Sequence, residues 1–213
     1  MFEKLKEDIQ TVKKRDPAAR SALEILFLYP GLKAIRAHRK AYWCYHHNLF
    51  FLARYISQRA ARKTGIEIHP AAKIGRRFFI DHGTGVVIGE TTEIGDDVTI
   101  YQGVTLGGTG KDTGKRHPTI GNHVMIGSGA KVLGPFKVGD HSKIASGAVV
   151  LEEIPAYSTA VGVPARVVRL YGEKVDVSDD EDLDQINIPD PVAQEIAKLQ
   201  SEIDELKQLI KKG

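Results

Sequence analysis

Aliphatic residues recur at every sixth position through the middle of this chain. The series starts at Ile68, restarts two residues late after Val86, breaks off after Leu106 and resumes at Ile120. A period of six fits neither a helix nor an alternating strand over such a length. It is typical of a parallel β-helix, in which each hexad forms one side of a three-sided coil of about eighteen residues. The aliphatic positions are Ile68, Ile74, Ile80, Val86, Ile88, Ile94, Ile100, Leu106, Ile120, Ile126, Val132, Val138, Ile144 and Val150.

Small residues complete the predicted coil. Glycine directly follows seven of the aliphatic positions, as expected where the backbone turns a sterically restricted corner. Small or branched residues stand four positions after the aliphatic ones, where they would fill the narrow interior. We therefore expect a β-helix domain over residues 67–169, with the segment 161–166 marking its end.

The pattern before the hexads is helical. We expect an N-terminal helical domain over residues 1–66, in which Asp16-Pro17 provides the N-cap and first position of a helix that ends near Leu28. A longer helix is predicted from Leu32 to about Lys63, closed by Thr64-Gly65. Its aromatic residues are interpreted as core packing: Tyr42, Trp43, Tyr45, Phe50, Phe51 and Tyr55.

Two segments follow the hexads. Residues 170–190 are rich in Asp and poor in aromatics, which predicts a solvated acidic linker. Residues 191–213 read as a short helix, with Ile and Leu at alternating spacings of three and four from Ile196 to Ile210. Such a short helix needs a partner, and both a coiled coil and packing against its own domain fit the pattern.

Composition places the chain among soluble globular proteins. Its 213 residues are 42% hydrophobic and 27% charged, and no apolar run approaches the ~18 residues of a membrane span. The N-terminus lacks the pattern of a signal peptide, and a single cysteine, Cys44, excludes an intrachain disulfide. We therefore expect a cytoplasmic protein without a membrane partner.

Charge is distributed unevenly along the chain. The net charge is +3, but residues 1–66 hold fourteen Lys and Arg against five Asp and Glu, whereas residues 170–213 hold five against twelve. A basic head and an acidic tail could attract each other between subunits. Binding of nucleic acid is the other interpretation, but the basic residues form no recognisable DNA-binding motif, so we expect no nucleic-acid partner.

One insertion interrupts the hexads with added length. Fourteen residues separate Leu106 from Ile120, eight more than the period requires, and the extra segment 107–118 carries four glycines and three cationic residues. Exposed backbone N–H groups beside cations suit an anionic ligand, although the segment is not a Walker A loop. Pro118 stiffens the point at which Arg116 and His117 are presented. A mobile surface loop is the alternative.

A second cluster, Asp81-His82, directly follows the core position Ile80 and is flanked by glycines. Histidine accepts a proton near neutral pH, and a carboxylate can orient it. Glu67 stands fourteen residues before Asp81, which is close to the length of one coil and would bring Glu67 within reach of His82.

Several motifs resemble those of the serine O-acetyltransferases, a family of hexapeptide-repeat acyltransferases. The resemblance extends from Asp8 to about Arg169 and includes Arg15-Asp16-Pro17-Ala18 in the head. The matching segments are 81–91 (DHGTGVVIGET), 102–111 (QGVTLGGTGK), 115–118 (KRHP) and 161–166 (VGVPAR).

The resemblance implies a mixed fold, with a helical head, a left-handed parallel β-helix and a short C-terminal helix. It implies transfer of an acetyl group from acetyl-CoA to the hydroxyl of L-serine, giving O-acetyl-L-serine and CoA, the first step of cysteine biosynthesis from serine. Three chains would pack side by side as a homotrimer, with each active site between two neighbours. The Ile and Leu positions of residues 191–213 favour a two-stranded coiled coil, so our hypothesis is that two trimers pair through these helices.

The resemblance also implies roles for single residues. His82 matches the general base and Glu67 the carboxylate paired with it, although the family often has Asp there. His117 and Asp81 count with them as catalytic candidates. The matches to residues that hold the amino acid are Asp16, Asp81, Arg116 and His117, and the expected acetyl-CoA contacts are Gly108, Ser128, Ser146 and Arg166.

Other expectations concern ligands and partners. We expect direct transfer without a covalent intermediate, since Cys44 has no apparent base beside it, and no metal. L-Cysteine resembles serine in every group that the site would hold, so feedback inhibition is expected. In some members a C-terminal Ile docks into O-acetylserine sulfhydrylase. Here Ile210 falls within the heptad pattern, which argues against that complex.

Three other functions fit parts of the sequence. A hexapeptide acetyltransferase acting on a sugar or xenobiotic hydroxyl would use the same histidine and CoA groove. A metal-dependent hydratase would bind zinc through His82, His117 and His123. A non-enzymatic scaffold would not need the insertion at 107–118.

Overall fold

The structure is a computed structural model that describes residues 2–110 and 113–170, together with Ile196, Gln200 and Ile203. The expected acidic linker and almost all of the expected C-terminal helix lie outside these residues. Four helices come first: α1 (Phe2–Arg15), α2 (Ala22–Leu28), α3 (Pro30–His46) and α4 (Phe50–Thr64). The strands that follow are β1 (Ile66–Ile68), β2 (Lys73–Ile74), β3 (Phe79–Ile80), β4 (Val86–Ile88), β5 (Glu93–Ile94), β6 (Thr99–Ile100), β7 (Thr105–Gly107), β8 (Thr119–Ile120), β9 (Met125–Ile126), β10 (Lys131–Leu133), β11 (Lys137–Val138), β12 (Lys143–Ile144), β13 (Val149–Val150), β14 (Ser158–Val161) and β15 (Arg166–Leu170).

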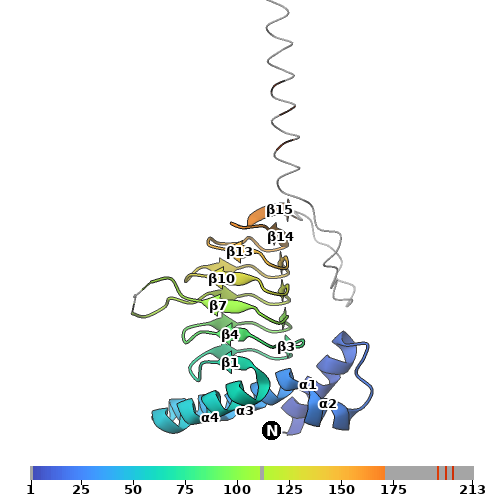
Figure 1. Cartoon of the computed structure of the whole chain (residues 1–213), viewed down its shortest axis with the longest axis vertical. Helices are drawn as coiled ribbons and strands as arrows, with labels where there is room; N and C mark the ends of the chain where they lie inside the picture. Colours follow the sequence, from blue (N-terminus) through green and yellow to red (C-terminus); the bar gives the residue numbers. More distant parts are fainter. Residues whose placement is uncertain (1, 111–112, 171–195, 197–199, 201–202, 204–213) are drawn as a thin grey trace, which may run out of the picture.

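The strands stack into a three-sided column above the helices (Figure 1). Its sides are parallel sheets in the orders β1-β4-β7-β10-β13, β2-β5-β8-β11 and β3-β6-β9-β12-β14, and β15 adds an antiparallel edge to β14. From β1 to β10, each strand pairs with the strand three places later in the chain, which is its counterpart in the next coil, as a parallel β-helix requires. The fold class predicted from the hexads is therefore confirmed.

The hexad residues build the core of the column. All of the aliphatic positions are buried except Ile74, which is half-buried in the first coil. The glycines that follow them are needed because coils lie close together, and a Cβ on Gly121 would come within 2.2 Å of Oδ1 of Asp140. Left-handed backbone occurs at other corner glycines, such as Gly129 with φ of 69°.

Register shows that the coils differ in length. Val87 in β4 pairs with Thr105, eighteen residues later, as predicted. In the first coil Ile66 pairs with Val86, twenty residues later, so this coil has two extra residues between β3 and β4. These residues fall in the corner that contains Asp81 and His82, and the eight residues added before β8 fall in the segment of Arg116 and His117.

The head closes the lower end of the column. Helices α3 and α4 lie beneath β1, and α1 and α2 lie beside them (Figure 1). Phe79 of β3 packs into a small second core with Val12, Ile25 and Leu32. The side chain of Arg15 donates to the backbone oxygen of Arg77 at 2.7 Å and pairs with Asp97. The head and the first coils therefore form one packed unit.

Two local predictions for the head are wrong. The single long helix is divided at His47–Leu49, because Asn48 adopts left-handed backbone with φ of 59°. Asp16 is not an N-cap, since Ser21 caps α2 by accepting from the N–H of Glu24. Asp16 instead follows the end of α1, where its carboxylate accepts from the N–H of Ala18 at 2.8 Å. The expected C-terminal closure at Gly65 is confirmed, with φ of 71°.

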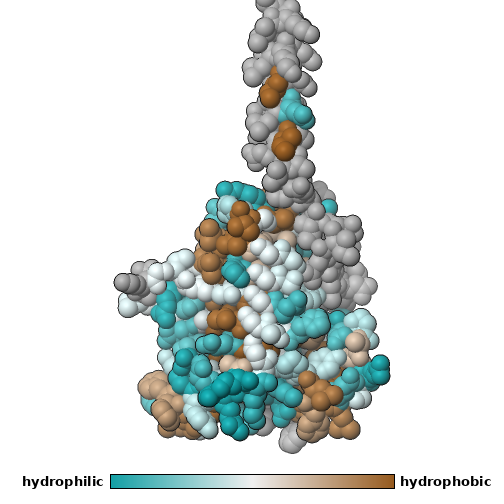
Figure 2. Space-filling view, viewed as in Figure 1, coloured by the Kyte–Doolittle hydropathy of each residue, from teal (hydrophilic) through white to brown (hydrophobic). Residues whose placement is uncertain are grey.

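The interpretation of the aromatic stretch as core packing is also wrong for most of its members. Phe51 is 87% exposed and Trp43 is 57% exposed, and Phe50 and Tyr55 are half exposed. Figure 2 shows hydrophobic surface on the head at the foot of the column. Among the described residues, no helix is both long and apolar enough to cross a membrane.

Parallel strands give the five-stranded face two distinct edges. The chain reaches this face through the corners 81–85, 101–104, 127–130 and 145–148, which we call the entry edge. It leaves the face through the corners 69–72, 89–92, 108–118 and 134–136, which we call the exit edge. A side of about six residues separates the two edges by roughly 15–20 Å.

Candidate functional site

His82 stands on the entry edge, in the lengthened corner between β3 and β4. Its side chain is 75% exposed, and its Nε2 lies 3.9 Å from Oδ1 of Asp81, too far for a hydrogen bond. Its backbone is left-handed with φ of 55°, an uncommon conformation for a side-chain-bearing residue. The corner therefore presents an imidazole outward on a short, glycine-flanked turn.

Three residues from the head and the column meet beside this corner. The hydroxyl of Tyr29 donates to Oδ2 of Asp16 at 2.6 Å. Burial raises the pKa of the Asp81 carboxyl, the nearby His82 opposes this, and the charge of Asp16 raises the pKa further. Burial also raises the pKa of Tyr29, as do its hydrogen bond to Asp16 and the charges of Asp16, Glu24 and Asp81, so its hydroxyl keeps its proton. Two acidic groups thus face one region next to His82, which suits a cationic ligand.

Glu67 lies in β1, where it pairs with Val87 of the next coil. Within the described residues, no hydrogen bond or ion pair joins Glu67 to His82. The predicted pairing of the two is therefore absent in the single chain as the structure describes it, and both Glu67 and Asp81 are available to orient the imidazole.

Arg116 and His117 stand on the exit edge, at the end of the inserted segment. Arg116 donates to Oε2 of Glu90 at 2.5 Å, and about a third of each side chain is exposed. One part of the guanidinium is thereby fixed, and its remaining N–H groups are left to bind a carboxylate. Gly108 lies at the base of the insertion, where a Cβ would come within 3.1 Å of the backbone oxygen of Arg116.

His117 is buried, with 8% of its surface exposed. Burial lowers the pKa of its imidazole, and the positive charges of Arg116 and Lys115 lower it further, while Glu90 opposes them. The ring lies against Gly89, where a Cβ would come within 1.9 Å of its Cδ2. His117 is therefore held neutral at physiological pH, in a place that only glycine leaves open.

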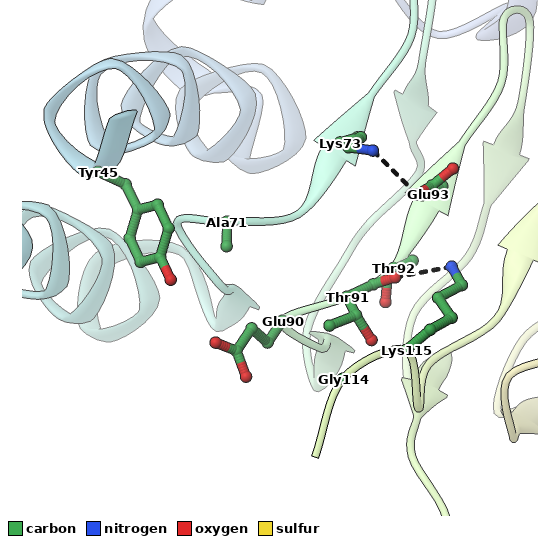
Figure 3. Close-up of a pocket in the computed structure, with 9 residues that line it drawn as sticks. All are labelled: Tyr45, Ala71, Lys73, Glu90, Thr91, Thr92, Glu93, Gly114 and Lys115. Atoms are coloured by element: carbon green, nitrogen blue, oxygen red, sulfur yellow. Dashed lines mark hydrogen bonds and ion pairs between the residues drawn. The ribbon is translucent and has the colours of Figure 1, made fainter. Parts of the chain in front are cut away.

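A cavity of about 390 Å³ lies beside these residues, between the head and the insertion (Figure 3). The side chains of Tyr45 and Glu90 point toward the same open space. Lys73 and Glu93 form an ion pair of 3.0 Å on its wall. The lining residues are Tyr45, Ala71, Lys73, Glu90, Thr91, Thr92, Glu93, Gly114 and Lys115. The exit edge thus has room for a small polar ligand.

The two candidate groups do not meet within one chain. His82 and Asp81 lie on the entry edge of the five-stranded face, whereas Arg116 and His117 lie on its exit edge. His123 lies on the third corner of the column, between β8 and β9. The hydratase interpretation, which needs three imidazoles at one zinc ion, is inconsistent with this placement, and the described residues contain no metal-binding cluster.

The residues predicted to contact acetyl-CoA are divided in the same way. Ser128 and Ser146 lie in successive coils of the entry edge above His82, with their Oγ atoms 3.1 Å apart. The surface beside them is open, since a Cβ on Gly129 or Gly147 would meet no atom within 4 Å. Arg166 lies at the far end of the column and pairs with Glu152 at 3.2 Å.

Three residues of these clusters were missed by the sequence analysis. Tyr29, Glu90 and Thr91 each hold a candidate residue in place through hydrogen bonds. One signal in the sequence did point to the entry edge: the two-residue shift of the hexads after Val86 marks the lengthened corner. No comparable signal identifies Tyr29, because its partner Asp16 lies thirteen residues earlier in the chain, before α2.

Comparisons with known proteins agree with the fold and the motifs. A family model described as "Bacterial transferase hexapeptide (six repeats)" matches residues 117–152. Serine acetyltransferase of Bacillus subtilis (strain 168) is 58% identical over 206 residues, which is 97% of this chain and 93% of that protein. Serine acetyltransferase of Bacillus pumilus (strain SAFR-032) is 56% identical over 206 residues, with the same coverage.

Solved structures give the same result. Serine acetyltransferase of Brucella abortus strain S19 in complex with coenzyme A has a TM-score of 0.78 and 46% identity, and the match covers 80% of this chain and 68% of that one. A serine acetyltransferase in complex with cysteine has a TM-score of 0.82 and 43% identity, with coverage of 88% and 72%. The enzyme of Neisseria gonorrhoeae in complex with serine has a TM-score of 0.76 and 40% identity, with coverage of 79% and 69%. The column is therefore a left-handed β-helix of the hexapeptide-repeat class.

Proposed function

The chain belongs to the serine acetyltransferase family, and on that basis we propose that it transfers the acetyl group of acetyl-CoA to the hydroxyl of L-serine with His82 as the general base. The observation that carries the mechanism is the meeting of Asp16 and Asp81 beside the exposed imidazole of His82. Two carboxylates next to a base provide a site for an ammonium group whose neighbouring hydroxyl is to be deprotonated. A neutral sugar has no ammonium group for these two carboxylates to bind.

The site is composite, formed between neighbouring copies of the chain. The entry edge of one copy supplies His82, Asp81 and Asp16, and the exit edge of the next copy supplies Arg116 and His117. A homotrimer meets this requirement, since each copy then offers its entry edge to one neighbour and its exit edge to the other. The separation of the two edges by roughly 15–20 Å within one chain supports this arrangement.

Serine would be held by its two charges. The carboxylates of Asp16 and Asp81 attract the ammonium group, and a cation between them relieves the repulsion that raises the pKa of Asp81. The guanidinium of Arg116, already oriented by Glu90, binds the serine carboxylate. This fixes the hydroxyl beside His82.

The chemical step then follows. The neutral imidazole of His82 removes the hydroxyl proton as the serine oxygen attacks the thioester carbon, which is worth about 10²–10⁴-fold in rate. The carbon–sulfur bond breaks as the tetrahedral intermediate collapses. The CoA thiolate leaves and accepts from His82 the proton that came from the serine hydroxyl. Acetyl-CoA would lie along the open entry edge past Ser128 and Ser146.

Direct transfer is supported by the position of the thiol. Cys44 is buried in α3, 5% exposed, and is not part of either edge. It therefore cannot serve as an acceptor for the acetyl group. L-Cysteine shares the ammonium and carboxylate groups of serine, and a relative has been solved in complex with cysteine, so competition at this site is proposed as well.

The proposal is tested by release of free thiol from acetyl-CoA in the presence of L-serine, D-serine, homoserine or a galactoside. Turnover with L-serine far above that with the other acceptors is expected, together with inhibition by L-cysteine that L-serine relieves. Preference for the galactoside would remove the assignment of the acceptor. Radioactive acetyl that accumulates on the protein without serine would overturn direct transfer.

A further inference from the structure

The backbone nitrogen, the backbone oxygen and Oγ1 of Thr91 all form hydrogen bonds with residues 115–117. Its backbone oxygen accepts from Nζ of Lys115 at 2.8 Å. Its Oγ1 accepts from the backbone N–H of Arg116 at 3.0 Å and from that of His117 at 3.1 Å. Its backbone N–H lies 3.2 Å from Nδ1 of His117, and its Oγ1 lies 2.9 Å from the same nitrogen.

These contacts settle where the protons lie. A backbone N–H only donates, so the nitrogen that faces it, Nδ1 of His117, must be an acceptor without a proton. The Oγ1 of Thr91 already accepts two N–H groups with its two lone pairs, so its own hydrogen is available to donate to Nδ1. A neutral ring that accepts at Nδ1 carries its proton at Nε2.

We propose that Thr91 is a positioning residue that holds His117 as the neutral Nε2–H tautomer and thereby makes it a hydrogen-bond donor and not a second base. The Nε2 atom has no hydrogen-bond partner in the described part of the chain, so its N–H remains for an oxygen of the bound substrate. This role rests on the proposed function, whereas the tautomer itself rests on geometry alone.

The charged groups around the ring favour the neutral state. Arg116 and Lys115 come from the insertion and oppose a positive charge on His117, and Glu90 from the preceding coil favours one. His69, from the corner below, also acts against a second positive charge. Burial also disfavours the charged ring. In addition, the two hydrogen bonds that Nδ1 accepts would have to break before this nitrogen could be protonated.

The first test needs no turnover, and it uses a variant only to assign signals. Long-range proton–nitrogen correlation spectra of the full chain labelled with ¹⁵N-histidine report which ring nitrogen carries the proton, with the His117 signals assigned from their loss in H117Q. The expected spectrum at pH 7 shows Nε2 protonated and Nδ1 not. A signal from Nδ1–H or from a doubly protonated ring would overturn the proposal, and would leave the acetyl transfer itself untouched.

Substitution of Thr91 provides the second test. Thr91→Val removes the hydroxyl without changing shape, and Thr91→Ser keeps it. We expect Thr91→Ser to retain the tautomer and most of the activity. Thr91→Val keeps the backbone N–H that faces Nδ1, so we expect the Nε2–H tautomer to remain the main form and the Nδ1–H tautomer to become detectable. We also expect this variant to raise the pH at which His117 titrates and to lower kcat/KM by roughly ten- to hundredfold. Thr159→Val in β14 is the matched control and should change none of these. An unchanged His117 titration in a folded Thr91→Val would contradict the role of the hydroxyl.

Discussion

Tyr29 and Asp16 are joined by a hydrogen bond of 2.6 Å from the phenol hydroxyl to the carboxylate, although thirteen residues and a helix separate them in the chain. The N–H of Ala18 holds the other carboxylate oxygen at 2.8 Å. Asp16 is therefore fixed by two donors, on the side of the head that faces Asp81. The relationship makes Tyr29 responsible for the geometry of the proposed ammonium site.

Tyr29→Phe removes the donor and leaves the ring packed against the second core. A hydrogen bond to a charged group is worth about 1.5–3 kcal/mol, so KM for L-serine should rise by at least roughly tenfold. The KM for acetyl-CoA and kcat should change far less, because neither depends on the ammonium site. Tyr157→Phe, whose ring stacks on His141 at 4.7 Å, is the control. An equal loss for both co-substrates would point to a general structural defect.

Arg116→Ala should mainly weaken serine binding. The substitution removes the proposed partner of the serine carboxylate and leaves Glu90 uncompensated, so KM for L-serine should rise by roughly a hundredfold with a smaller change in kcat. Arg116→Lys should recover only part of the loss. The positive charge is kept, but an ammonium group cannot bind a carboxylate in the bidentate manner. Arg59→Ala on the exposed side of α4 serves as the control. Initial rates over a range of serine concentrations separate the two constants.

Replacement of His82 should affect kcat. His82→Asn is the suitable variant, because asparagine tolerates the left-handed backbone found there, with φ of 55°. Loss of the general base should lower kcat by about 10²–10⁴-fold while the KM values stay within a few fold. Retention of more than a tenth of the wild-type kcat would exclude His82 as the base.

The orientation of His82 can be assigned by comparing Glu67→Gln with Asp81→Asn. If Glu67 of β1 orients the imidazole, Glu67→Gln should lower kcat and shift the acidic limb of the pH–rate profile to lower pH. Asp81→Asn should then act mainly on KM for serine. The reverse pattern would assign the orienting role to Asp81, the nearer carboxylate at 3.9 Å.

Stability should fall in mild acid because of His38. Burial lowers the pKa of this imidazole to about 4, and its Nε2 has no partner among the described residues. A histidine whose pKa is depressed on folding contributes stability above its ordinary pKa of about 6.5, and the contribution is lost as pH falls towards 4. The loss should be about 3 kcal/mol, and the half-buried ring of His69 and the buried ring of His117 should add to it.

Urea unfolding at several pH values measures this loss. His38→Gln should flatten the dependence on pH between 6.5 and 4, whereas the exposed His46→Gln should leave it as in the wild type. A slope that is the same in all three proteins would show that other groups cause the acid sensitivity.

The hexads made the column predictable, because one aliphatic residue per side is a local requirement that every coil repeats. The departure from the period after Leu106 also identified the segment of Arg116, whereas His82 was singled out by its place beside Asp81 and the flanking glycines. Neither observation reveals which corners lie at opposite edges, since that depends on the order of the strands in space. The contact of Asp16 with Tyr29, and that of Thr91 with His117, depend on pairs of coils or helices for which no local pattern exists.

The head was harder to predict for a different reason. Trp43 and Phe51 are of residue types common in protein cores, yet their side chains are exposed here. Hydrophobicity alone cannot distinguish a buried aromatic residue from an exposed one. The break at Asn48 depends on a single residue in left-handed backbone, which asparagine accepts more readily than most residues do. Neither feature changes the periodicity from which helices are recognised.

The placement of His82 and Arg116 at opposite edges of one face has a consequence for mixtures of inactive chains. In a proposed trimer, chains lacking His82 and chains lacking Arg116 would each have little activity alone at low serine concentration, yet a junction between the intact edge of one and the intact edge of the other would be complete. Co-refolding equal amounts of His82→Asn and Arg116→Ala should therefore rescue activity at about a quarter of the junctions. The same two substitutions placed together in one chain should give no such rescue, because every junction would then lack both residues.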